Sequence, residues 1–181
     1  MSNHDGPMIT DFGTDPEPDA LLDFLADWVS GSRAAAELHV ADHANGQGTT
    51  LVARQDQTIV GLVTVRWKSN NPALADHNIP LVHQLTVVPG YRRRGIGSAL
   101  MSAAEALAAR RGHRALGITV GLFDEYGPAQ RLYVRRGYVP DGRGVCRALT
   151  PLREGENVTI DHSLIIWLIK ELPDWSSDDD W

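Results

Sequence analysis

Apolar residues recur along this chain in two patterns, every third or fourth position in some segments and every second position in others. The first spacing is typical of helices with one buried face, and the second of half-buried strands. They predict helices over residues 19–29, 34–43, 95–111 and 128–136, and strands over 8–10, 50–54, 59–67, 81–88, 115–122 and 158–170, the last being one long strand or a pair. Strands crossed by helices predict an α/β or α+β fold with both faces of the sheet covered.

The strand predicted over 115–122 has one face made of small residues. Its apolar residues alternate with Gly117, Thr119 and Gly121. A face of this kind can lie beneath a ligand or beneath a closely packed helix, because no side chain holds a neighbour away. We expect packing there.

The stretch from Val87 to Leu100 joins a predicted strand to a predicted helix and reads Val-Val-Pro-Gly-Tyr-Arg-Arg-Arg-Gly-Ile-Gly-Ser-Ala-Leu. Gly95 and Gly97 lack a Cβ, so the backbone can turn sharply and approach a ligand closely. The helix that follows directs free N–H groups and the positive end of its dipole at this turn. Beside three arginines, such a turn favours an anion, most often a phosphate.

Two common nucleotide-binding patterns do not fit this turn. A Walker loop needs Gly-x4-Gly-Lys-Ser/Thr, which the sequence lacks. A dinucleotide fingerprint needs a third small residue where Leu100 stands and an acidic residue about 20 positions on. Thr119 and Gly121 occupy that region instead.

The spacing Arg92-x-x-Gly95-x-Gly97 resembles the Arg/Gln-x-x-Gly-x-Gly/Ala motif of the GNAT superfamily of N-acetyltransferases. A second segment is similar to the other motif of that family, Asn-x-x-Ala-x-x-Leu-Tyr-x-x-x-Gly-Phe/Tyr. It matches at Ala129, Leu132, Tyr133, Gly137 and Tyr138, whereas Tyr126 stands where the family usually has Asn. The resemblance covers roughly residues 51–138.

The resemblance implies a mixed, splayed sheet of six or seven strands, with acetyl-CoA entering at the splay. It also implies that loop amides hold the pyrophosphate of acetyl-CoA and that an amine attacks the thioester directly in a ternary complex. The cofactor-binding residues expected from it are Leu85, Val87, Arg92, Arg93, Arg94, Gly95, Ile96, Gly97, Ser98, Ala99 and Tyr126. An amide N–H between Leu85 and Val87 is the expected oxyanion donor.

Acetyl transfer requires one group that supplies a proton to the leaving thiolate and one that removes a proton from the amine. Tyr133 aligns with the general-acid tyrosine of the family. His83, on the strand before the loop, is the expected base, with an inflection near about pH 6 to 7.5. Water held by Gln84, or the carboxylates of Glu125 and Asp124, are the alternatives.

The 181 residues are enough for one domain, expected over 19–175, with a flexible arm over 1–18 and an acidic tail over 176–181. The net charge of −6 argues against nucleic acid as a partner. No apolar run reaches membrane-spanning length and the N-terminus lacks the features of a signal peptide, so a cytoplasmic protein is expected. Cys146 is the single cysteine, which excludes an internal disulfide and a cysteine-based metal site.

Two functions from different classes remain open at this point. One is an acetyl-CoA-dependent N-acetyltransferase, with a small amine or an antibiotic favoured as acceptor over a protein N-terminus. The other is a non-catalytic acyl-CoA-binding sensor or interaction module, against which the presence of Tyr133 argues. A homodimer is an open possibility, through an exposed C-terminal strand that carries Trp167.

Overall fold

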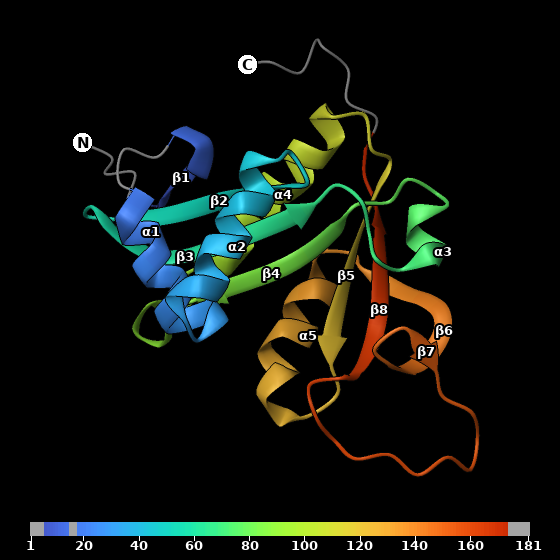
Figure 1. Ribbon diagram of the computed structural model, residues 1–181. Coiled ribbons are helices and arrows are strands. Elements are labelled where there is room, and N and C mark those ends of the chain that lie inside the picture. The colour runs from blue at the N-terminus through green and yellow to red at the C-terminus, as the bar shows by residue number, and fades with distance from the viewer. Residues whose placement is uncertain (1–5, 15–17, 174–181) are drawn as a thin grey trace. The chain divides into compact units, whose positions relative to one another are not determined.

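The computed structural model describes residues 6–14 and 18–173 (Figure 1). The chain divides into two compact units. The first consists of the chain up to Lys68 together with Val82–Leu107, and the second of Ser69–Leu81 together with the chain from Ala108 onward. The acidic tail expected over 176–181 lies outside the described residues.

The strands of the first unit lie in the order β1-β2-β3-β4. β1 pairs antiparallel with β2, and a tight turn joins β2 to β3 in an antiparallel hairpin that opposes Gln55 and Thr58. Their bounds are Met8–Asp11, Gly48–Gln55, Thr58–Arg66 and Leu81–Val87. Both β2 and β3 are buried along almost their whole length, because helices cover the sheet.

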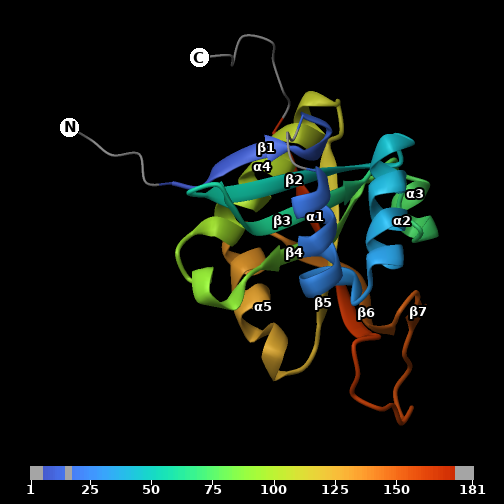
Figure 2. The same ribbon diagram turned by 60° about the vertical axis from the view of Figure 1, so that its left-hand side comes forward.

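Three helices pack on these strands: α1 (Pro18–Leu25), α2 (Arg33–Ala44) and α4 (Ile96–Arg110). Figures 1 and 2 show α1 and α2 on the face opposite α4. The alternation along β3 agrees, since Leu62 joins the core beneath α1 and α2, whereas a Cβ at Gly61 would lie 3.2 Å from Leu100 of α4. Short helical turns follow β1, α1 and β4, at Phe12–Thr14, Ala26–Ser30 and Pro89–Tyr91.

The second unit contains strands in the order β5-β8-β6-β7. β8 pairs antiparallel with β5 and with β6, and β6 pairs antiparallel with β7. The elements are α3 (Pro72–Ala75), β5 (Ala115–Gly121), a 3-10 turn η4 (Asp124–Tyr126), α5 (Gly127–Arg135), β6 (Val139–Arg147), β7 (Thr150–Pro151) and β8 (Leu164–Glu171). The buried side chains of Leu74, Leu81, Cys146 and Trp167 form its core.

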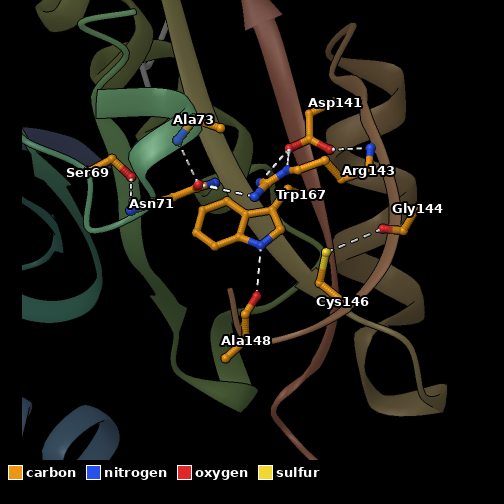
Figure 3. Close-up of polar contacts among 9 residues, drawn as sticks. All are labelled: Ser69, Asn71, Ala73, Asp141, Arg143, Gly144, Cys146, Ala148 and Trp167. Carbon is orange, nitrogen blue, oxygen red and sulfur yellow. Dashed lines mark hydrogen bonds and ion pairs between the residues drawn. The ribbon is translucent and has the colours of Figure 1, made fainter. Parts of the chain in front are cut away.

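A bulge interrupts β6 between Pro140 and Val145. Figure 3 shows the polar contacts that hold it. Arg143 donates to Asp141 at 2.7 Å through Nε and to Asn71, the residue that caps α3, at 3.1 Å. The guanidinium also lies over the indole of Trp167, whose Nε1–H donates to the Ala148 carbonyl. These contacts tie the start of α3 to the bulge.

Several sequence expectations are wrong in this second unit. The part of the chain that the structure describes contains eight strands rather than six or seven. β6, β7 and the short helix α3 were not expected, and the strand expected over 158–170 begins only at Leu164. Trp167 is buried, with 3% of its surface exposed, so it does not form an exposed surface on the last strand.

Packing accounts for the small-residue face of β5, as expected. A Cβ at Gly117 would lie 2.8 Å from Cδ1 of Leu74, and one at Gly121 would collide with the ring of Tyr126. Across the described ranges, no helix has the length and apolar character that a membrane span requires.

Candidate active site

The turn between β4 and α4 contains two residues in the left-handed region of backbone conformation. Arg93 and Gly95 both have positive φ angles, of 62° and 83°. The left-handed region costs Arg93 conformational energy, whereas Gly95 enters it freely. A Cβ added to Gly95 would meet nothing within 4 Å, so this residue faces open space at the start of the helix.

The N-terminus of α4 presents unpaired backbone amides at this turn. The first hydrogen bond of the helix runs from Ala99 N–H to the Gly95 carbonyl at 2.9 Å. Within the described residues, the N–H groups of Ile96 and Gly97 have no backbone acceptor. Free amides and the positive end of the helix dipole together make a site for an anion.

The three arginines of the turn have different surroundings. Arg92 donates through Nε to the Val87 carbonyl at 2.9 Å, which fixes the turn to the end of β4. Arg94 lies over the ring of Tyr91, with 5.3 Å between the guanidinium carbon and the ring centroid. Arg93 is exposed and has no contact of this kind with any described residue. The Arg93 guanidinium is therefore available to an anion.

The strand β4 leads into this turn and contains the other predicted residues of the first unit. His83 is exposed, and Leu85 and Val87 are half-buried. Gln84 donates through Nε2 to the Thr86 hydroxyl at 3.0 Å, so its amide group is held along the strand. One continuous segment, from β4 into the first turn of α4, thus contains His83, Leu85, Val87 and all residues from Arg92 to Ala99.

The surroundings of His83 favour the neutral imidazole. Burial, and next to it the positive charge of Arg66, lower the pKa of His83 to about 4, while Asp42 acts in the opposite direction. The side chain is nevertheless exposed, so water at the ring offsets part of this effect. The inflection expected from His83 therefore moves from near pH 6 to 7.5 down to between about 4 and 6.5.

Tyr133 is positioned by the way α5 ends. Gly137, with φ 87°, closes the helix: its N–H donates to the Val134 carbonyl at 3.0 Å, and Tyr138 N–H donates to the Tyr133 carbonyl at 3.0 Å. This pair of bonds is a Schellman motif, which needs glycine at the left-handed position. The rings of Tyr133 and Tyr138 then lie edge to face, 6.0 Å apart. The spacing Tyr-x-x-x-Gly-Tyr thus fixes the tyrosine at the helix end.

The phenol of Tyr133 keeps its proton in the interior of the second unit. The residue is buried, with 6% of its surface exposed, and burial raises the pKa of Tyr133 above its ordinary value. Its hydroxyl has no hydrogen-bond partner among the residues that the structure describes. The hydroxyl oxygen is not fully buried, so it retains some exposed surface. The hydroxyl is thus protonated and accessible.

Tyr126 lies on the second unit with Tyr133. Its ring packs on Gly121, and its hydroxyl lies 3.2 Å from Nδ1 of His162. The rival carboxylates Asp124 and Glu125 are exposed, and Asp124 accepts a hydrogen bond from the Glu125 backbone. Sequence reasoning missed His162, since nothing in the pattern around it indicates a contact 36 residues away.

Among the described residues, no group of three His, Cys, Asp or Glu side chains could hold a metal ion.

The family model for the acetyltransferase (GNAT) family matches residues 11–138. The chain belongs to this family. The expected α/β fold class is confirmed by solved structures of GNAT acetyltransferases that share the fold. No curated protein sequence matches the chain significantly.

Three solved structures illustrate the likeness. An aminoglycoside 6'-acetyltransferase type Ii has a TM-score of 0.64 at 19% identity, covering 91% of this chain and 96% of that one. A GNAT acetyltransferase from Elizabethkingia anophelis with acetyl-CoA bound has a TM-score of 0.60 at 16% identity, covering 93% and 99%. A nourseothricin acetyltransferase has a TM-score of 0.54 at 25% identity, covering 71% and 68%.

Proposed function

We propose that this GNAT protein transfers the acetyl group of acetyl-CoA to a primary amine by direct attack within a ternary complex. The observation that carries the proposal is the anion site at the start of α4. Free amides at Ile96 and Gly97, the open space at Gly95 and the exposed Arg93 fit a pyrophosphate. We further propose that residues 19–175 act together as one acetyltransferase domain, since the family match includes parts of both units.

The residues of the turn would hold acetyl-CoA through its pyrophosphate, and the half-buried edge of β4 at Leu85 and Val87 would line its pantetheine arm. Bound there, acetyl-CoA supplies an acetyl group activated as a thioester. Arg92 contributes indirectly, because its bond to the Val87 carbonyl holds the turn in shape. The amides carry most of the contact.

Two side chains transfer the protons of the reaction, one from the amine and one to the leaving thiolate. A lysine-like ammonium is neutral only about once per thousand molecules at neutral pH, so its proton must leave before it attacks. His83, neutral above about pH 4 to 6.5, passes that proton to water, with water held beside Gln84 as the alternative route. Tyr133 then donates its phenolic proton to the coenzyme A sulfur as the carbon–sulfur bond breaks.

A small amine or an aminoglycoside-like antibiotic is the acceptor class that we favour over a protein N-terminus. Two of the similar structures are acetyltransferases named for antibiotics, an aminoglycoside and nourseothricin. The net charge of −6 also suits a cationic acceptor. Both considerations support the class of acceptor and not a particular compound.

A thiol-release assay with acetyl-CoA and a panel of amines tests the function. The panel contains aminoglycosides, nourseothricin, small polyamines, free amino acids and peptides with a free N-terminus. Amine-dependent release of coenzyme A supports the transferase. Tight acetyl-CoA binding by calorimetry, with no release for any amine, would instead favour the non-catalytic binding module.

A further inference from the structure

The last residue of β5, Gly121, lies directly beneath an aromatic ring. A Cβ added there would fall within 3.0 Å of the ring of Tyr126, which real Cβ atoms do not do. The ring therefore packs closely on the backbone at the end of the strand. Only glycine allows this approach, so the small residue at the end of β5 is explained by Tyr126.

Tyr126 is held in place from its other side. Its hydroxyl lies 3.2 Å from Nδ1 of His162, in the segment that leads into β8. The ring of Phe123 meets Tyr126 edge to face at 4.9 Å and His162 at 5.2 Å. Edge-to-face aromatic contacts are favourable and directional, so these three rings fix one another.

Gly121 is also bonded to the helix that carries Tyr133. Gln130 of α5 donates through Nε2 to the Gly121 carbonyl at 2.8 Å. Gln130 and Tyr133 are three positions apart and therefore share one side of the helix. This bond places that side of α5 at the end of β5, where Figure 1 shows the helix running beside the strand.

We propose that Gly121, Tyr126, Gln130 and His162 form a clasp that positions Tyr133 for proton donation, an inference that rests on the proposed function. In this proposal none of the four contacts the reacting atoms, and all act as positioning residues. The helix α5 has nine residues, which is too short to be stable by itself. Its position therefore depends on contacts at its ends, the Schellman motif at one end and the clasp at the other.

The clasp also gives Tyr126 a role other than that of the Asn that usually stands there. Its ring and hydroxyl are both engaged within the second unit, with Gly121 and His162. Replacing Tyr126 by Asn therefore separates two roles. A positioning role is lost with the ring, whereas a direct contact with the pantetheine arm would be kept or improved.

Steady-state kinetics of four variants test the clasp. Gln130→Glu keeps the size of the side chain but removes the donor, and Tyr126→Asn removes the ring. We expect kcat to fall about 10-fold in each, with KM for acetyl-CoA within about 3-fold, since a displacement of about 1 Å can cost as much as 100-fold. His162→Leu should lower kcat as well, and His162→Asn, whose amide oxygen can replace Nδ1 as acceptor, should restore it.

Hydrogen exchange supplies a readout that does not depend on turnover. Gln130→Glu and Tyr126→Asn should speed exchange of the amides of residues 127–133, with α2 as internal reference. Val134→Ala is the matched control, because this α5 side chain is 67% exposed, and it should change neither exchange nor kcat.

The positioning role of the clasp would be overturned by unchanged kcat in Gln130→Glu and Tyr126→Asn, or by a lower KM for acetyl-CoA in Tyr126→Asn with kcat retained. Failure of the proposed function has a different outcome. If Tyr133→Phe turns over like the wild type while the clasp variants still exchange faster, the acid assignment is rejected and the clasp remains as a support of α5. Unchanged exchange would reject the clasp itself.

Discussion

The Gly95 carbonyl accepts the first hydrogen bond of α4 from Ala99 N–H, at 2.9 Å. Because the bond starts at Ala99, the N–H groups of Ile96 and Gly97 have no backbone acceptor among the described residues and can take an external partner. The residue that ends the turn therefore also begins the helix. A Cβ at position 95 would meet nothing within 4 Å, so a side chain there would extend into open space at the start of α4.

Gly95→Asp should weaken acetyl-CoA binding at least about 10-fold, or about 1.4 kcal/mol. The carboxylate would strain a backbone with φ 83° and place a negative charge where phosphate is expected. Gly112→Asp is the matched control, since Gly112 follows α4 at its other end, with φ 81° and open space around it. Calorimetry showing equal affinity for both variants would contradict the site.

Arg92→Ala should weaken acetyl-CoA binding less than Gly95→Asp does, because the Arg92 side chain donates to the Val87 carbonyl.

Tyr133→Phe should lower kcat about 100-fold and leave acetyl-CoA affinity within a few-fold, as is usual for loss of a general acid. The ring packing on Tyr138 would be retained. Since burial raises the pKa of Tyr133, its proton stays in place above the ordinary phenol value of about 10, and kcat should show no alkaline loss from this group below that pH. Wild-type turnover in Tyr133→Phe, followed by thiol release, would mean that solvent supplies the proton.

The parts of the site that the sequence predicts are those built by short-range geometry. The turn from Arg92 to Gly97 needs positive φ, a helix start and basic side chains within six residues, and all three leave a local pattern. The end of α5 is similar, because the Schellman motif fixes the interval between Tyr133 and Gly137. These features depend little on the rest of the chain.

The features that the sequence does not reveal depend on contacts between distant segments. β6 lacks an alternating pattern because Pro140 and the bulge that follows it interrupt the strand. Val158 and Ile160 are β-branched and favour a strand, yet both are exposed and precede β8. The clasp needs His162 to meet Tyr126, and no local spacing encodes that contact.

Asp141→Ala should destabilise the protein by about 3 kcal/mol, because it leaves the Arg143 guanidinium largely buried without its carboxylate. The two side chains are only 5% and 22% exposed. Asp23→Ala is the matched control: its bond to Arg33 is 2.7 Å long, but the side chains are 68% and 51% exposed. That variant should lose under about 1 kcal/mol. Denaturant unfolding measures both, and equal losses would show that burial of the Asp141 pair adds nothing.

Stability should fall in acid as His39 becomes protonated. Its Nε2 lies 2.8 Å from the Thr64 hydroxyl and 3.2 Å from that of Thr50, and burial, followed by the charge of Arg66, lowers the pKa of His39. The unfolded chain binds this proton more readily, so stability is present above about pH 6.5 and is lost as pH falls toward the lowered folded value.

The melting temperature between about pH 7.5 and 5 measures this effect. His39→Gln should flatten the decline, whereas His77→Gln, at an exposed position, should leave it unchanged. Identical declines in His39→Gln and the wild type would assign the acid sensitivity to other groups, of which His83 is the first candidate.

The last prediction concerns proton removal from the acceptor. Burial and the charge of Arg66 lower the pKa of His83, and water at its exposed side chain offsets part of this effect, so the basic form of His83 predominates at neutral pH. If His83 relays the proton, kcat/KM should rise with pH through an inflection between about 4 and 6.5, then follow only the ionisation of the amine at higher pH. A base this weak takes a proton from an ammonium poorly, so its role is to pass the proton on to water.

His83→Ala should remove the acid inflection and lower kcat/KM on the plateau. Gln84→Met provides the comparison, since it removes the amide that bonds to Thr86 and leaves the imidazole in place. A lower plateau with the inflection intact in Gln84→Met, together with a wild-type profile in His83→Ala, would assign proton removal to the water beside Gln84.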